Sequence, residues 1–195
     1  MSEKLFFKMP IIKNKILEIL KKKNLSQLKL ACIINYDDAG LNAMILGKRP
    51  FPEIIKEKLL PILEVSKEEF ESWIIADKYD KEIIKKAIES AKWIASSHPT
   101  DVPCNDDKNK PLILTQNIDR ILKEKKLSRT ALSKIIKHSQ SSLNCAIIGK
   151  EPLSKNVMKK LSTTLEIPEK DLQAWVLADK YPLSILELAL KVGHF

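Results

Sequence analysis

A short run of polar side chains in the second half of the chain has the composition needed to contact nucleic acid. The run comprises Gln140, Ser141, Ser142 and Asn144. A glutamine can pair with adenine through two hydrogen bonds, and a serine can donate to or accept from a base edge or a phosphate. The basic residues that flank the run along the chain are Arg129, Lys137 and Lys150. These residue types predict contacts with bases and phosphates.

The elements that must position these side chains can be read from the apolar pattern of residues 127–149. Apolar residues at helical spacing occupy 132–136, a polar break follows at 137–139, and a second helical pattern over 143–147 ends at Gly149. Two short helices joined by a tight polar turn form a helix-turn-helix, which presents its second helix to a DNA major groove. The pattern therefore predicts this unit.

The same frame occurs 102 residues earlier, from 25 to 47, and the two halves align without a gap. Trp73 aligns with Trp175, and the segment Ala76-Asp77-Lys78-Tyr79 recurs as Ala178-Asp179-Lys180-Tyr181. Such self-similarity indicates an internal duplication. We expect the two tryptophans to pack in hydrophobic cores and the two A-D-K-Y segments to be helix ends with a capped turn.

The fold class predicted from these patterns is all-α, with about five helices in each half and no alternating strand pattern of useful length. The last helix of the first half is expected at about 81–95, and the second half copies the first. Residues 98–111 are rich in Pro, Asp and Asn, which is typical of a linker. The predicted domains are 1–97 and 112–195, joined by this linker.

The repeated motif resembles the Cro/C1-type (XRE, lambda-repressor-like) helix-turn-helix family. The motif reads L-S-x-x-x-L-A/S, nine variable positions, L-N, four more positions and G-K-x-P. The resemblance covers about residues 13–66 and again 115–168, and the Trp and A-D-K-Y helices are an addition to it. It implies two tandem five-helix domains of this family and a transcriptional regulator that binds specific double-stranded DNA sequences.

The resemblance also implies roles for individual residues. The start of the second family helix, which contacts phosphate, falls on Gln27 and Arg129. The base-reading start of the third helix falls on Asp38, Ala39 and Gly40 in the first half, and on Gln140, Ser141 and Ser142 in the second. Asn42 and Asn144 follow one turn on, and the loop beyond supplies Lys48, Arg49 and Lys150. Lys137 lies in the second turn and adds positive charge.

The two halves differ in chemistry at these positions. Asp37 and Asp38 would face phosphates and oppose binding, and Gly40 weakens its helix by about 1 kcal/mol relative to alanine. We therefore expect the second repeat to dominate DNA contact and the first to contribute weakly or to serve packing. The alternative is a protein–protein interaction module that keeps the fold and has lost base readout.

Composition supports a polyanionic partner and gives no support to catalysis. The 195 residues carry a formal net charge of +9, which favours attraction to phosphates, although a lysine-rich composition can also reflect genome base bias. We expect no enzyme activity and no cofactor, because the sequence lacks a carboxylate cluster, a metal-spaced His/Cys set and a glycine-rich phosphate loop.

The remaining expectations concern cellular location and partners. Three widely spaced cysteines, Cys32, Cys104 and Cys145, fit a reducing cytoplasm. No apolar run reaches the roughly 18–20 residues that span a bilayer, so no membrane association is expected. The expected partner is double-stranded DNA, and a homodimer through the C-terminal helices and a protein partner are left open.

Overall fold

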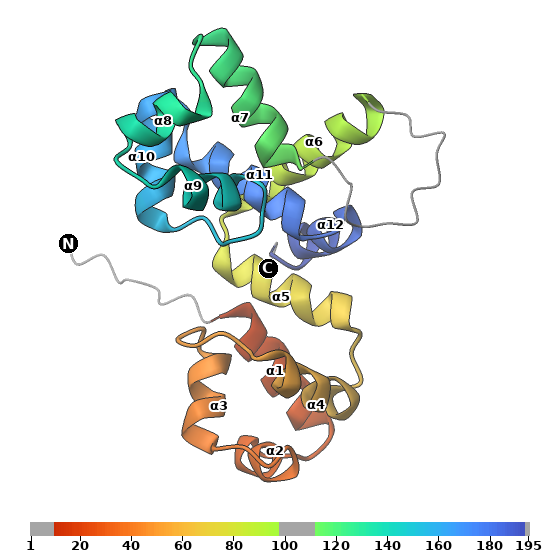
Figure 1. Ribbon diagram of the computed structural model, residues 1–195. Coiled ribbons are helices and arrows are strands. Elements are labelled where there is room, and N and C mark those ends of the chain that lie inside the picture. Colours follow the sequence, from red (N-terminus) through yellow and green to blue (C-terminus); the bar gives the residue numbers. More distant parts are fainter. Residues whose placement is uncertain (1–9, 98–111, 194–195) are drawn as a thin grey trace, which may run out of the picture. The chain divides into compact units, whose positions relative to one another are not determined.

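The structure of the protein is a computed structural model that describes residues 10–97 and 112–193. Within these ranges there are twelve helices and no strand, which confirms the all-α prediction (Figure 1). The first half holds α1 (Ile11–Lys22), α2 (Gln27–Ile33), α3 (Asp38–Ile45), α4 (Glu53–Leu63), α5 (Lys67–Lys78) and α6 (Lys81–Ser97). The second half holds α7 (Ile113–Glu124), α8 (Arg129–Ile135), α9 (Gln140–Ile147), α10 (Lys155–Leu165), α11 (Glu169–Lys180) and α12 (Leu183–Val192).

The duplication extends from the sequence to the backbone. Each helix of the first half begins 102 residues before its counterpart in the second half. Residues with positive φ recur at the same offset in the described ranges. These pairs are Asn24 and Lys126, Asn35 and Lys137, Gly47 and Gly149, and Glu64 and Glu166. The two copies therefore share their turns as well as their helices.

The prediction of five helices per half is wrong, because each half has six in the described ranges. Tyr79 has an extended backbone (φ −121°, ψ 142°), which ends α5 and separates it from α6. Tyr181 does the same between α11 and α12, with φ −123° and ψ 140°. The sixth helix is thus an element of its own in both copies.

The described helices group into two compact units that do not follow the two repeats. The first unit contains α1–α5 together with the part of α12 from Glu187 onward. The second unit contains α6 from Glu82, all of α7–α11, and the start of α12 as far as Leu186. The expected linker, 98–111, lies outside the described residues, so the domain limits 97 and 112 stay predictions.

The core of the first unit forms where α1 packs against α3, α4 and α5. Phe70 is fully buried and Trp73 is 1% exposed, which agrees with the expected core role of this tryptophan. The Phe51 and Phe70 rings meet edge to face, with centroids 5.3 Å apart. Each fully buried apolar side chain contributes about 1.5–3 kcal/mol to stability. α3 is therefore anchored through its buried Leu41 and Ile45.

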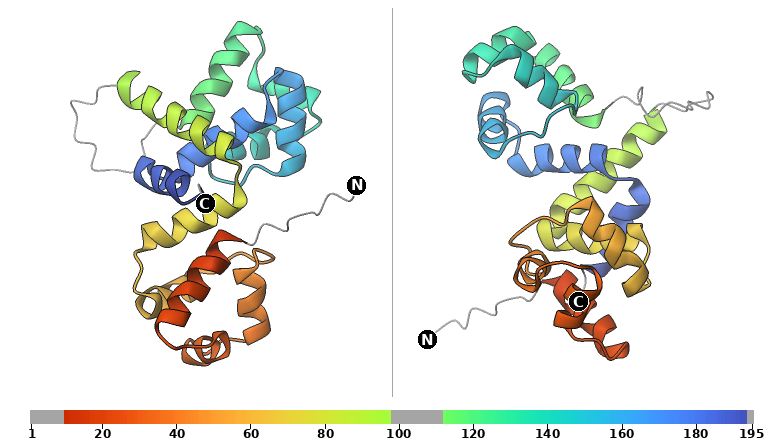
Figure 2. Two further views of the ribbon diagram at one scale, coloured as in Figure 1. Left: turned by 180° about the vertical axis from the view of Figure 1, so that it is seen from behind. Right: turned by 60° about the horizontal axis from the view of Figure 1, so that its bottom comes forward.

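The second unit repeats this arrangement around α7, which packs against α9 and α11. Ile118 of α7, Leu132 of α8 and Leu143 of α9 are fully buried in one cluster. Trp175 packs against that cluster but is only partly buried. Figure 2 shows α6 alongside α7 and α11, and residues of these three helices line a common hollow.

The repeated A-D-K-Y segment lies at the end of a helix, as expected, and its aspartate caps the start of a different helix. The Asp77 carboxylate accepts hydrogen bonds from the backbone N–H groups of Ile11 and Ile12, at 2.5 and 2.9 Å. Asp179 accepts equivalent bonds at the start of α7, at 2.6 and 3.0 Å. Each aspartate therefore satisfies two N–H donors that have no partner within their own helix, 65 or 66 residues away, and places negative charge at the positive end of that helix.

Candidate nucleic-acid interface

The short helices α8 and α9 are joined by the four residues 136–139, which gives the spacing expected for the predicted unit. Lys137 adopts a left-handed backbone (φ 51°), and the N–H of His138 donates to the Ser133 carbonyl at 2.9 Å. The Ser139 hydroxyl then caps α9 by accepting from the Ser142 N–H at 3.3 Å. The turn is therefore closed by its own backbone and one neutral side chain.

The four expected base-reading residues of α9 have different environments. Gln140 and Ser141, in the first turn, are exposed. The Ser142 hydroxyl donates to a Glu151 carboxylate oxygen at 3.3 Å. Asn144 is half-buried, and its Oδ1 is covered without a hydrogen-bond partner. Gln140 and Ser141 are thus the two side chains that are most accessible to an incoming base edge.

The expected phosphate-binding residues also divide into exposed and engaged groups. Lys137 and Lys150 are exposed. Arg129 instead pairs with Asp119 of α7 through two hydrogen bonds, of 2.8 Å from Nε and 2.7 Å from a terminal nitrogen. This two-pronged geometry is rigid and directional. Arg129 therefore holds the start of α8 against α7, a positioning role that the sequence pattern did not indicate.

Hydrogen bonds to the ends of the helix pair fix its place on the rest of each unit. The Thr115 hydroxyl of α7 donates to the Ile147 carbonyl at the end of α9, at 2.9 Å. The Lys160 ammonium donates to the Ile136 carbonyl at 2.8 Å, and Lys58 makes the same bond to Ile34 in the first repeat, at 2.9 Å. Both lysines place positive charge at a helix C-terminus, which the helix dipole favours.

Lys126 is a functional candidate that the sequence analysis did not place in the site. It has a left-handed backbone (φ 52°) in the turn between α7 and α8 and is exposed. Two of the left-handed positions lie in the turns before the second and third helices of each repeat. The first repeat has Asn24 and Asn35 at these positions, whereas the second has Lys126 and Lys137. Asparagine tolerates this conformation and lysine does so less readily. Lys126 is thus identified as a candidate by two observations together: the Asn-to-Lys difference between the aligned repeats and the left-handed backbone at this position.

The corresponding face of the first repeat is acidic at the start of its helix. Asp37 caps α3 by accepting from the Gly40 N–H at 2.5 Å. Asp38 follows as the first residue of α3, and one of its carboxylate oxygens is covered without a hydrogen-bond partner. The other expected contacts are distributed over the surface: Gln27 is half-buried, and Asn42, Lys48 and Arg49 are exposed.

Gly40 has a steric reason to be glycine, beyond the helix weakening that its type predicts. A Cβ at this position would lie 2.8 Å from an Asp37 carboxylate oxygen and 3.0 Å from the Tyr36 ring. The acidic cap and the glycine therefore belong together. In the second repeat, Ser139 replaces the aspartate as the cap and Ser142 occupies the glycine position.

The charge balance of the two faces follows from these substitutions. The N-terminus of α3 carries two carboxylates, whereas that of α9 begins with neutral Ser139 and Gln140. In the loop after this helix the first repeat is the more basic of the two, because its Arg49 corresponds to Glu151 in the second repeat. Since a helix N-terminus carries partial positive charge, α9, with no acidic residue in its own first turn, is more favourable to anions there than α3, although the Glu151 carboxylate lies against Ser142.

Within residues 10–97 and 112–193, no group of three or more His, Cys, Asp or Glu side chains could hold a metal ion. Cys32 is exposed and Cys145 is half-buried, both as free thiols, and Cys104 lies outside the described residues. None of the described helices is both long and apolar enough to cross a bilayer. No family model matches the chain, and searches of curated proteins and of solved structures found no match.

Proposed function

We propose that the protein is a transcriptional regulator that binds specific double-stranded DNA sequences through two tandem helix-turn-helix units, the second being dominant. The observation that carries the proposal is the first turn of α9. There Gln140 and Ser141 are exposed beside a neutral cap, and exposed lysines occupy the turns before α8 and α9. In this class of unit, the N-terminal residues of the second helix meet base edges in the major groove.

The proposed division of labour follows from the side chains. Gln140 pairs with adenine through its amide, and Ser141 bonds a neighbouring base or phosphate. Lys126, Lys137 and Lys150 neutralise phosphates, which supplies affinity that depends on salt but carries no sequence information. The first repeat adds the positive charges of Lys48 and Arg49, but its Asp37 and Asp38 carboxylates repel the DNA phosphates. Its contribution to DNA affinity is therefore smaller.

Selection of bound duplexes from a random DNA pool, using the full chain, tests this proposal. The expected result is enrichment of a sequence with one strongly specified half, which contains an adenine contact, and one weakly specified half. Recovery of unenriched pools, together with an affinity for random duplex that does not change with salt, would contradict it. Enrichment of a perfect palindrome would contradict the unequal roles of the two repeats.

A protein-interaction module that has lost base readout is the second candidate, and exposed apolar residues of the first repeat favour it. Leu28, Ile33 and Ile54 are 61%, 56% and 67% exposed. The second repeat has Thr130 and Asn156 at the positions of Leu28 and Ile54, so most of this apolar surface belongs to the first repeat alone. Retention on heparin with a measured salt slope separates the candidates, because a slope near zero excludes DNA binding as the main role.

A further inference from the structure

A hollow of about 370 Å³ lies within the second unit, between α6, α7 and α11. Its lining consists of Glu89, Ser90 and Trp93 of α6, Asn117 and Arg120 of α7, and Trp175 of α11. Pockets that enclose small molecules usually have volumes of about 300–1,000 Å³. The hollow is therefore large enough for a small ligand and too small for a folded partner.

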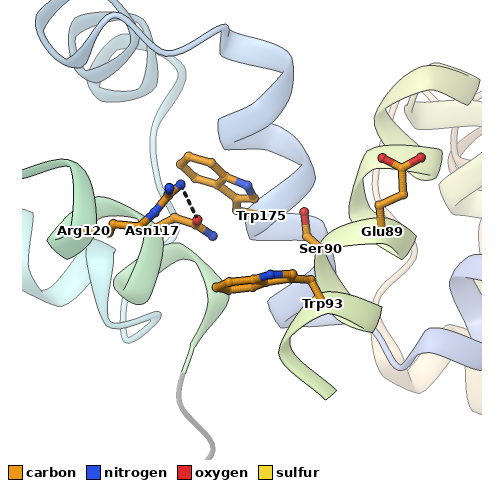
Figure 3. Close-up of a pocket in the computed structure, with 6 residues that line it drawn as sticks. All are labelled: Glu89, Ser90, Trp93, Asn117, Arg120 and Trp175. Atoms are coloured by element: carbon orange, nitrogen blue, oxygen red, sulfur yellow. Dashed lines mark hydrogen bonds between the residues drawn. The ribbon is translucent and has the colours of Figure 1, made fainter. Parts of the chain in front are cut away.

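Two indole rings form opposite walls of the hollow. Figure 3 shows Trp93 on one side and Trp175 on the other, with Asn117 and Ser90 between them at the two ends. Trp175 is supported from behind, since it packs against the core cluster of the second unit. Trp93 is 54% exposed, an unusual environment for so large an apolar surface. A planar molecule placed between the rings would cover both.

The polar groups of the lining retain hydrogen-bonding capacity. The Asn117 amide donates to the Ile113 carbonyl at 3.0 Å and accepts from Arg120 at 3.3 Å. The Arg120 side chain is 60% exposed, and its ion pair with Glu124 is a long one, of 3.8 Å. The Ser90 hydroxyl donates to the Lys86 carbonyl at 2.8 Å, which leaves its oxygen free to accept. The Arg120 guanidinium can therefore pair with an anion at the edge of the hollow.

The first unit supplies an internal comparison, because several residues aligned with the lining of the hollow differ in burial and in chemistry. Trp73, aligned with Trp175, is 1% exposed. Val192, aligned with Ser90, packs against the apolar cluster that contains Trp73. Lys15 and Glu18 replace Asn117 and Arg120. One copy of the duplicated site is closed around its tryptophan, whereas the other carries the polar groups and the second indole that a ligand would use.

We propose that this hollow binds a small planar heteroaromatic molecule that carries an anionic group, such as a nucleotide. The two indoles stack on the ring, as aromatic side chains do with bases. Asn117 and Ser90 bond the polar edge of the ring, and Arg120 pairs with the anion. This assignment is independent of DNA binding, because none of the lining residues belongs to α8 or α9.

The test is a titration of the full chain, without DNA. Binding is measured by calorimetry for every probe and also by tryptophan fluorescence for the nucleotides, because indole-3-acetate itself fluoresces as an indole. The probes are AMP, UMP and indole-3-acetate, with adenosine supplying the ring alone and inorganic phosphate the anion alone. The expected result is saturable binding of at least one anionic aromatic probe, weaker binding of adenosine, and no binding of phosphate. No detectable binding of any of the three anionic aromatic probes up to about 10 mM, well above the dissociation constant of a weak complex, would overturn the proposal.

Substitutions in the lining test whether the probe binds in the hollow. Trp93→Ala and Arg120→Ala should each weaken the affinity for the probe by about tenfold or more, given the usual cost of losing one aromatic stacking partner or a charged hydrogen bond. Glu18→Ala is the matched control, because Glu18 holds the Arg120 position in the first repeat and also pairs with a residue four positions on, Lys22. Equal losses in Arg120→Ala and Glu18→Ala, or unchanged affinity in Trp93→Ala, would overturn the proposal. A single-stranded oligonucleotide that binds where no mononucleotide does would also overturn it.

Discussion

At the scale of single residues, the most informative difference between the repeats is the replacement of two asparagines by lysines. Asn24 and Asn35 correspond to Lys126 and Lys137, and all four have left-handed backbones with φ between 51° and 52°. A left-handed conformation costs a residue with an ordinary side chain roughly 1–2 kcal/mol, and asparagine less. The second repeat therefore tolerates backbone strain at the positions where it gains positive charge, a combination that often marks functional sites.

Lys137→Asn should separate the two effects. The substitution copies Asn35, so it should raise the free energy of unfolding by about 0.5–1 kcal/mol because asparagine fits the left-handed turn. It should also weaken DNA binding and reduce the salt slope by about 1, because one phosphate contact is lost. Chemical denaturation and a salt titration measure the two quantities.

The reverse substitution in the first repeat, Asn35→Lys, is the control for Lys137→Asn. It should lower stability by a similar amount and increase DNA affinity less than Lys137→Asn decreases it. A stability loss in Lys137→Asn, or unchanged DNA affinity, would contradict the role given to this lysine.

At the scale of helices, the sequence was sufficient for the elements but not for their side-chain contacts. Helical periodicity and the 102-residue repeat predicted the order of the helices, and the helix end at the segment that contains Asp77 was expected. The partner of that aspartate is 65–66 residues away, and no local pattern indicates such a contact. The pairing of Arg129 with Asp119 was missed for the same reason, since it depends on how α7 packs beside α8.

The residues expected to read bases were predicted to lie on one helix, as they do, but their different exposures were not predicted. A pattern of residue types places Ser142 and Asn144 on the same helix as Gln140. It does not reveal that Glu151 accepts from Ser142, or that the Asn144 oxygen is covered. The count of about five helices per half was one too low, although the helix end at Tyr79 and the separate last helix at about 81–95 were both expected.

The link between α11 and α7 gives a stability prediction. Asp179→Ala leaves the Ile113 and Leu114 N–H groups without their acceptor and should lower the free energy of unfolding by about 1–2 kcal/mol. Asp179→Asn keeps one acceptor oxygen and should lose about half as much. Thermal or urea unfolding measures both, and Glu57→Ala, at an exposed carboxylate in the interior of α4, should change stability by less than about 0.5 kcal/mol. Equal effects in Asp179→Ala and Glu57→Ala would argue against the cap.

At the scale of the whole molecule, the proposed DNA binding should have a salt dependence set by the basic side chains of the two unequal repeats. The second repeat has three exposed lysines near α9: Lys126, Lys137 and Lys150. At about −0.9 per phosphate neutralised, they predict a slope near −3 when the logarithm of the binding constant is plotted against the logarithm of the salt concentration. Full engagement of Lys48 and Arg49 as well would give about −4.5. We expect a value close to −3, measured by fluorescence anisotropy on random duplex between low and physiological salt.

A steeper slope has a specific meaning for this molecule. If a slope steeper than −3 returned to about −3 only when Lys48 and Arg49 were replaced by alanine, then the first repeat would contact phosphates despite its carboxylates. That result would contradict the dominance of the second repeat while leaving DNA binding itself intact.

The central claim, that α9 reads DNA and α3 does so weakly or not at all, is tested most directly at one pair of aligned positions. Gln140 and Asp38 are the first residues of α9 and α3. On a duplex recovered by selection, Gln140→Ala should weaken binding by about 1–3 kcal/mol relative to the unaltered protein, the usual cost of a lost two-bond base contact. Asp38→Ala should leave affinity unchanged or increase it, because a carboxylate facing phosphates is removed. A larger loss in Asp38→Ala than in Gln140→Ala would contradict the claim.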